Sequence, residues 1–96
     1  MKVRFLHEAS LEFLDAISFY EEKAPGLGHR FKAEFESTLR WLRKNPESCR
    51  LTPGGYRRLT LRVFPFQIVY VIRDSTLWVV AVPHERREPE YWLSRR

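Results

Sequence analysis

The hydrophobic periodicity of this chain changes near its middle, and this change limits the folds that it can adopt. Apolar residues recur at helical spacing in two consecutive segments, 8–23 and 27–44. Pro25-Gly26 separates the two segments, and Asn45-Pro46 ends the second. Two helices joined by so short a break are expected to form an antiparallel hairpin with one shared apolar face.

The second half of the chain instead alternates between apolar and polar residues, as β-strands do. Three strands are expected over residues 56–64, 66–73 and 77–82, after a short first strand over 3–5. The segment 66–73 is apolar on both faces, which predicts a central strand. The predicted fold class is α+β with the order β-α-α-β-β-β, in which the helical hairpin packs on one face of a small antiparallel sheet.

Four large side chains are predicted to lie in the core of this fold. Phe31 and Phe35 occupy the apolar stripe of the second helix, and Ile68 and Tyr70 share one face of the central strand. The opposite face of the sheet is expected to present a row formed by Arg58 and Arg62, together with the end of the last strand. A short helical turn is expected over residues 88–93.

Length and composition indicate one small domain over residues 1–96. The hydrophobic content of 44% is enough for a core without covalent cross-links. The single cysteine, Cys49, cannot form an internal disulfide, which fits a reducing compartment. No apolar run approaches the roughly 20 residues that span a bilayer, and the first residues are too charged for a signal peptide. We therefore expect a cytoplasmic protein that is not bound to a membrane.

The net charge of +5 is concentrated in the second half of the chain. Residues 1–48 carry eight basic and eight acidic side chains, whereas residues 49–96 carry nine basic and four acidic ones. All nine basic residues of the second half are arginine, which holds planar anions through paired hydrogen bonds. The pattern favours phosphate or the carboxylates of a partner as a ligand; an ordinary solvated surface is the alternative.

The last predicted strand leads directly into residues that can bind phosphate or transfer protons. The segment after it reads Pro83-His84-Glu85-Arg86-Arg87-Glu88-Pro89-Glu90-Tyr91-Trp92. An imidazole titrates near neutral pH, and arginines and aromatic rings are typical of binding surfaces. This end of the sheet is therefore the first place to look for a functional site.

The same tail, His-x-Arg-Arg-acid-Pro-x-Tyr-Trp after a hydrophobic last strand, resembles the C-terminus of the RelE/ParE superfamily of bacterial toxins, particularly its ParE-like branch. Further elements in the same order extend the resemblance over nearly the whole chain. They are Tyr20-Glu21-Glu22, the junction Pro25-Gly26-Leu27-Gly28-x-Arg30-Phe31, Asn45-Pro46 and Arg57-Arg58. Pro83 departs from the family, which usually has a small or apolar residue before the histidine.

This resemblance implies the toxin of a type II toxin-antitoxin pair, of the kind linked to plasmid stabilization. Such a toxin is neutralised by a cognate antitoxin in a hetero-oligomer. ParE-like members poison DNA gyrase, whereas RelE-like members cut mRNA on the ribosome. We expect gyrase as the target, because the predicted strand 56–64 has no lysine and the tail is ParE-like. The alternatives are a ribosome-dependent mRNA endonuclease and a non-toxic nucleic-acid or protein-binding module on the same scaffold.

Each alternative predicts its own site residues. A metal-free nuclease would use His84 for proton transfer, Arg58 and Arg62 to hold the phosphate, and Tyr91 as a proton donor or stacking ring. A surface that binds a target or an antitoxin would use exposed arginines and aromatics: Arg57, Arg58, Arg62, Arg86, Arg87, Tyr91 and Trp92.

Several of these residues also have purely structural interpretations. His84 can cap a strand end, Tyr91 and Trp92 can cover a sheet edge, and Arg86 and Arg87 can form surface ion pairs. Neither a cofactor nor a metal is expected, because the histidines are far apart in sequence and Cys49 has no partner at ligand spacing.

Overall fold

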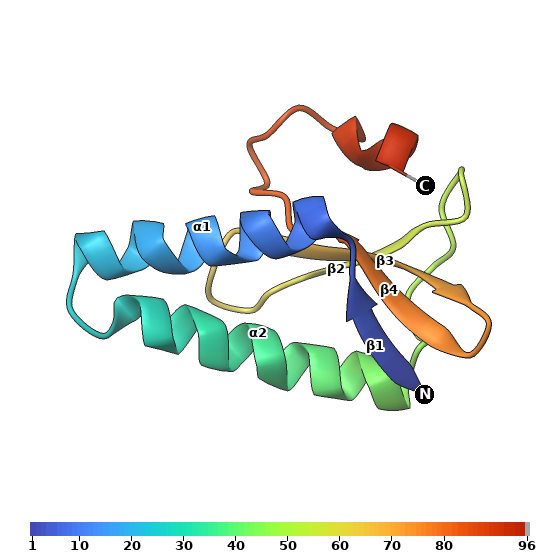
Figure 1. The fold of residues 1–96 in the computed structure, drawn as a ribbon, viewed down its shortest axis with the longest axis horizontal. Helices are drawn as coiled ribbons and strands as arrows, with labels where there is room; N and C mark the ends of the chain where they lie inside the picture. Colours follow the sequence, from blue (N-terminus) through green and yellow to red (C-terminus); the bar gives the residue numbers. More distant parts are fainter. Residues whose placement is uncertain (96) are drawn as a thin grey trace.

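The helices and strands follow one another in the order that the periodicity predicts. The computed structural model describes residues 1–95. Its elements are β1 (Lys2–Phe5), α1 (His7–Lys23), α2 (Leu27–Lys44), β2 (Arg57–Thr60), β3 (Gln67–Arg73), β4 (Thr76–Ala81) and the 3-10 helix η1 (Tyr91–Arg95). The order β-α-α-β-β-β is confirmed, and α1 and α2 form the predicted hairpin (Figure 1). None of the helices within residues 1–95 is long and apolar enough to cross a bilayer.

The four strands form one sheet in the order β1-β4-β3-β2. The strands β2, β3 and β4 are antiparallel neighbours, as predicted, but β1 pairs with β4 in parallel. The chain passes through both helices between β1 and the rest of the sheet, and such a crossover allows a parallel neighbour. The sheet is therefore mixed rather than wholly antiparallel, and its two open edges are β1 and β2.

The strand predicted over residues 56–64 is shorter than expected, because β2 ends at Thr60. Beyond it, the backbone N–H groups of Arg62 and Val63 donate to the carboxylate of Glu34 on α2, at 2.6 and 3.2 Å. These amides are therefore bound to a helix side chain rather than to β3. Arg58 and Arg62 do not share a row on one strand face, so that expectation was wrong.

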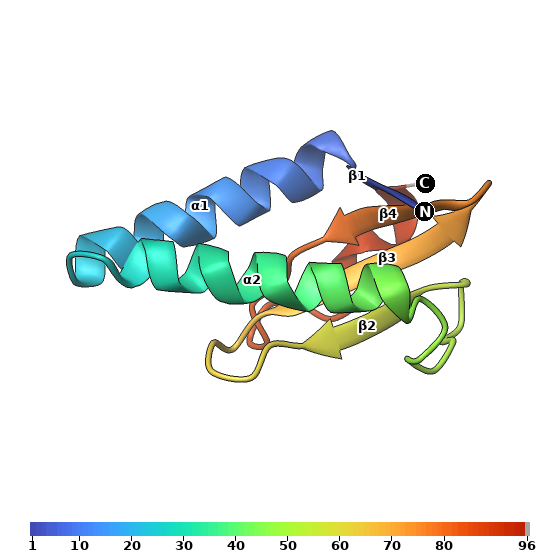
Figure 2. The same cartoon turned by 90° about the horizontal axis from the view of Figure 1, so that it is seen from below.

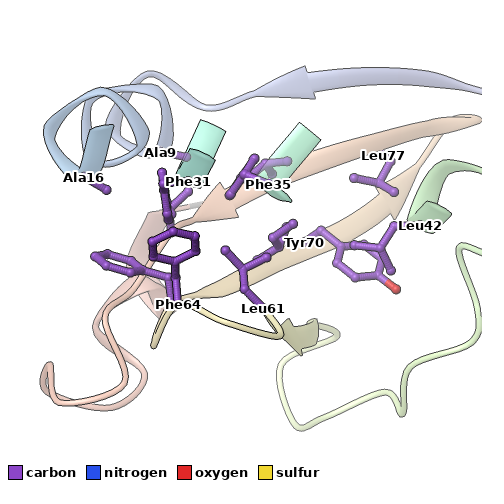
Figure 3. Packing of buried hydrophobic residues seen from close by; sticks show 13 residues of the cluster. Ala9, Ala16, Phe31, Phe35, Leu42, Leu61, Phe64, Tyr70 and Leu77 are labelled. Atoms are coloured by element: carbon purple, nitrogen blue, oxygen red, sulfur yellow. The ribbon is translucent and has the colours of Figure 1, made fainter. Parts of the chain in front are cut away.

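The core between the helices and the sheet contains the four predicted residues. Phe31, Phe35, Ile68 and Tyr70 are fully buried, which confirms the predictions for the apolar stripe of α2 and for one face of β3. Figure 3 shows Phe31, Phe35 and Tyr70 within this cluster. The Tyr70 hydroxyl donates to the carbonyl of Pro46 at 2.9 Å, so its buried polar atom is satisfied.

The opposite face of the sheet is covered by the C-terminal segment rather than open to solvent. Trp92 is only 4% exposed and packs there with Tyr56, Val69, Val71, Val80 and Ala81. Figure 2 shows the helices in front of the sheet and the C-terminal segment behind it. The predicted turn over 88–93 is present as η1, shifted to Tyr91–Arg95. His84 does not lie on this face as expected, because its ring contacts Phe66 on the helix side.

The break between α1 and α2 is closed by the side chain of Glu21. Its carboxylate accepts the backbone N–H groups of Gly26 and Gly28, at 2.9 and 3.0 Å. Gly26 has φ 85°, a left-handed conformation that glycine adopts without strain. Hydrogen bonds from Gly26 and then Gly28 hold the pKa of Glu21 below its ordinary value, so the carboxylate stays ionised at neutral pH.

Gly28 lies at a close approach of the two helices, and we expect Gly28→Ala to lower the free energy of unfolding by about 2 kcal/mol. A Cβ atom at this position would lie 2.6 Å from the carbonyl oxygen of Ile17, so the helices would have to separate. Urea denaturation measures the change. The exposed neighbour His29→Ala is the control and should shift stability by less than about 0.5 kcal/mol. Equal midpoints for both variants would contradict the close approach.

Candidate functional site

The C-terminal segment is tied to α1 by a cluster of charged and aromatic side chains. Arg95 donates to Glu12 Oε2 at 2.8 Å and to the carbonyl of Val80 at 3.1 Å. Arg87 lies 3.6 Å from the same Glu12 oxygen, and its guanidinium stacks 3.9 Å from the Tyr91 ring centroid. The Val82 N–H donates to the second Glu12 oxygen at 2.8 Å. One carboxylate thus joins α1, the end of β4 and η1.

The electrostatics of this cluster keep Glu12 charged and Tyr91 neutral at neutral pH. Burial disfavours the charged carboxylate, but hydrogen bonds from Arg95 and Val82 outweigh it and hold the pKa of Glu12 below its ordinary value. Burial and then the nearby Glu12 charge raise the pKa of Tyr91 well above its ordinary value. The buried Tyr91 hydroxyl lies close enough to Glu12 for that negative charge to raise its pKa, but it makes no hydrogen bond of standard geometry. These properties favour a structural role for the cluster, as a clasp that holds η1 against α1.

His84 lies at the edge of a shallow hollow between the end of the sheet and α1. The hollow has a volume of about 240 Å³, and its lining includes Asp15 and Phe19 from α1 and also Arg87. The backbone N–H of Arg86 donates to His84 Nδ1 at 3.0 Å, so this nitrogen acts as an acceptor. Its ring packs edge-to-face on Phe66, with centroids 5.1 Å apart. His84 thus accepts a hydrogen bond from the turn that follows β4, and it shares the lining of this hollow with Arg87.

The arginines of the 57–62 region have three different environments. Arg57 donates to the carbonyls of Cys49 and Glu47 and so anchors the loop before β2. The exposed Arg58 lies over the Trp92 ring, 5.8 Å from its centroid. Arg62 lines a separate hollow between α2 and β2. No single anion site among the described residues is formed by these three side chains.

The structure therefore brings together only part of the predicted nuclease set. Arg87 connects the His84 hollow to Tyr91, but Arg58 lies over Trp92 and Arg62 beside α2. Arg86 and Arg87 are exposed, whereas Trp92 is buried and Tyr91 half-buried. Within residues 1–95, no group of three or more His, Cys, Asp or Glu side chains is placed to hold a metal ion.

Sequence reasoning did not identify Glu12 or Arg95, the two residues that fasten the C-terminal segment. They are 83 positions apart, and the local pattern of α1 distinguishes Glu12 only weakly from the other acidic residues of that helix. A weak signal did exist, because Glu12 is followed by the apolar Phe13 and Ala16 on the buried side of the helix.

Comparison with known proteins agrees with the fold and the tail. Residues 3–89 match the family model of the ParE toxin of the type II toxin-antitoxin system, parDE. The chain belongs to the ParE toxin family. The match covers most of the chain, including β1, both helices and the His84 segment, so the protein is a type II toxin of the RelE/ParE superfamily.

A solved structure supports the same fold. A chain of the chromosomal ParDE TA system from P. aeruginosa superposes with a TM-score of 0.77 and 16% sequence identity. The alignment covers 88% of this chain and 95% of that one, so the likeness extends over the whole ParE fold. No curated protein matches the sequence.

Proposed function

We propose that this ParE-family protein is a growth-inhibiting toxin that binds DNA gyrase in the cytoplasm and is neutralised by a cognate antitoxin. The proposal rests on how the side chains of the C-terminal segment are arranged. Its aromatic pair is folded into the structure, while the side chains of Arg86 and Arg87 are exposed and their backbone N–H groups are hydrogen-bonded to His84. A rigid surface with exposed arginines is suited to binding a large partner, since little side-chain and backbone order must be gained.

The placement of the titratable groups supports binding rather than RNA cleavage. Cleavage without a metal needs an acid, a base and fixed positive charge around one phosphate. Here the Tyr91 hydroxyl is buried beside Glu12 and has a raised pKa, which makes it a poor acid near neutral pH. Arg62 lines a different hollow from His84. Arg58 lies over Trp92, so none of the other three nuclease candidates lines the hollow beside His84.

The target can be tested in cells by inducing the protein and pulse-labelling DNA, RNA and protein synthesis. The proposal predicts an early fall in DNA synthesis together with an SOS response. Translation should fall only later. An early fall in translation with intact DNA synthesis would instead support the ribosome-dependent endonuclease. Growth and all three syntheses unchanged would support the non-toxic binding module.

Substitutions in the tail are expected to reduce toxicity in a graded way. Arg86→Ala and Arg87→Ala should each reduce gyrase inhibition by roughly 5- to 30-fold, because each removes one contact from a binding surface. His84→Ala should change inhibition by less than about threefold. The exposed Arg30→Ala on α2 is the matched control. Complete loss of toxicity in His84→Ala, with antitoxin binding intact, would show that chemistry at the imidazole is required.

A further inference from the structure

The sheet face that carries η1 is not covered over its whole area. The buried Trp92 of η1 packs with Tyr56, Val69 and Ala81 on this face. Beside η1, the same face has a hollow of about 190 Å³, whose lining consists of Leu6, Val71, Arg73, Trp78, Val80 and Arg95. Trp78 is only partly buried there. A flat aromatic ring is therefore accessible from solvent in a depression of the sheet surface.

The strands around this hollow carry only positive charge. The four described strands contain no acidic residue, and their basic residues are Lys2 and Arg4 in β1, Arg57 and Arg58 in β2, and Arg73 in β3. Arg4 lies opposite Trp78 in the register of β1 and β4, and Lys2 lies opposite Thr76. Because directly opposite residues project to the same side of a sheet, Lys2 and Arg4 flank the hollow from β1. Arg73 flanks it from β3.

These three cations have no competing partner among the described residues. Within residues 1–95, no ion pair is formed by Lys2, Arg4 or Arg73, whereas Arg95 is held by Glu12. Charges on an edge strand also prevent edge-to-edge pairing, and this role accounts for Lys2 and Arg4. It does not account for Arg73, because β3 is an inner strand. Nor does it account for a partly exposed indole between the charged side chains.

The size and the lining of the hollow limit what it can bind. Its volume lies below the roughly 300 Å³ of typical sites for whole small molecules, so it can hold one ring rather than an entire ligand. Nucleobases stack on indole rings, and guanidinium groups hold phosphate through paired hydrogen bonds. A nucleotide combines a flat ring with a nearby phosphate. A glutamate-rich peptide supplies negative charge but no ring for Trp78.

We propose that this face binds a nucleotide unit, with its base stacked on Trp78 and its phosphate held by Arg73 and Arg4. Lys2 contacts a neighbouring phosphate. The unit belongs either to a free nucleotide or to a single-stranded nucleic acid, because both present an unpaired base and a phosphate. A duplex keeps its bases paired and cannot offer one to the ring. Binding of this kind goes beyond the proposed contact with gyrase and does not depend on it.

The test uses a fluorescein-labelled single strand of eight adenylates and measures its fluorescence anisotropy at low salt. Trp78→Leu should weaken binding by at least tenfold, because it keeps an apolar side chain but removes the stacking ring. Arg73→Gln should weaken binding about fivefold and reduce the slope of log affinity against log salt by about 0.7. Trp41→Leu and Arg30→Gln are the matched controls on α2 and should remain within twofold of the parent. Circular dichroism checks that each variant is folded.

A change at Asp74 should act in the opposite direction. Asp74 lies in the turn that follows Arg73 and lines an adjoining hollow together with Lys2. Its φ of 51° is a conformation that asparagine also adopts readily, so Asp74→Asn preserves the turn. Removing this negative charge should strengthen binding of the labelled strand about two- to threefold. Unchanged or weaker binding would contradict a phosphate at this end of the sheet.

A titration with AMP distinguishes the two sources of the nucleotide unit. The indole N–H resonance of Trp78 should move in a saturable way, while that of Trp41 stays in place. Similar affinities for AMP and for the labelled strand would indicate a free nucleotide, and an affinity at least tenfold higher for the strand would indicate a nucleic acid. Either result supports the shared chemistry.

Three results would overturn the proposal. They are the absence of saturable binding of both probes to the parent, equal binding to the parent and Trp78→Leu, and equally effective displacement of the strand by an acidic peptide. The peptide has one phenylalanine between four glutamates, and its success would assign the face to an acidic protein partner. Failure here leaves the gyrase proposal intact, because inhibition of supercoiling is measured separately.

Discussion

Phe35→Ala is expected to lower the free energy of unfolding by about 3–5 kcal/mol. Phe35 is fully buried, and its ring centroid lies 4.4 Å from that of Phe13 and 6.1 Å from that of Phe5. Truncation would leave a cavity at the point where α1, α2 and β1 meet. A domain of this size has a total stability of about 5–15 kcal/mol, so the variant should lose a large share of its stability.

The matched control for this prediction is Phe19→Ala on α1. Phe19 is the same residue type but is 50% exposed, so its loss should cost less than about 1 kcal/mol. Guanidinium denaturation followed by tryptophan fluorescence gives both values. A Phe35→Ala midpoint equal to that of the parent would mean that the apolar stripe of α2 does not face the sheet.

The second large effect is expected at Glu12, whose replacement by alanine should cost about 2–3 kcal/mol near neutral pH. The change removes the acceptor for Val82 and Arg95 and leaves a half-buried guanidinium without its partner. Hydrogen exchange in residues 91–95 should accelerate, since this carboxylate fastens η1 to α1. The exposed Asp15→Ala, one turn along the same helix, should change stability by less than about 0.5 kcal/mol. Similar losses in both variants would argue against a specific clasp.

The contribution of Glu12 should also depend on pH in a defined direction. Its folded-state pKa lies below the ordinary value of 4.5, so the unfolded chain takes up the proton first as the pH falls. The stabilisation is therefore fully present above about pH 5 and is lost as the pH falls through the folded-state pKa. The stability difference between the parent and Glu12→Gln should shrink over this acidic window. A difference that stays constant from pH 7 to pH 3 would show that the charge of Glu12 is not involved.

Those parts of the fold that depend on local periodicity could be predicted from the sequence. Phe31 and Phe35 lie one helical turn apart, and Ile68 and Tyr70 alternate with Val69 and Val71, so both elements and their buried faces were predictable. The end of β2 could not be predicted, because Leu61 continues the apolar alternation of the strand. The chain leaves the sheet there because Glu34, 28 residues earlier, binds the next amides.

The site was less predictable because its contacts join distant parts of the chain. The segment with His84, Arg86 and Arg87 could be located from the tail, and the structure places it at the end of the sheet beside α1. The burial of Trp92 depends on Tyr56 and Val69. The ring of Tyr91 packs against the guanidinium groups of Arg87 and Arg95, which lie over it. Charge counts by sequence half did not reveal that Arg62 and Trp41 line the same hollow between α2 and β2.

The most direct test of the proposed target is a gyrase supercoiling assay with the purified toxin. Relaxed plasmid, gyrase and ATP are incubated with the parent protein, with the parent plus its antitoxin, and with His84→Ala. We expect the parent to inhibit supercoiling and to increase cleaved plasmid, the antitoxin to reverse both effects, and His84→Ala to inhibit nearly as well. Unimpaired supercoiling, together with mRNA cleavage on ribosomes that is lost in His84→Ala, would contradict the gyrase assignment.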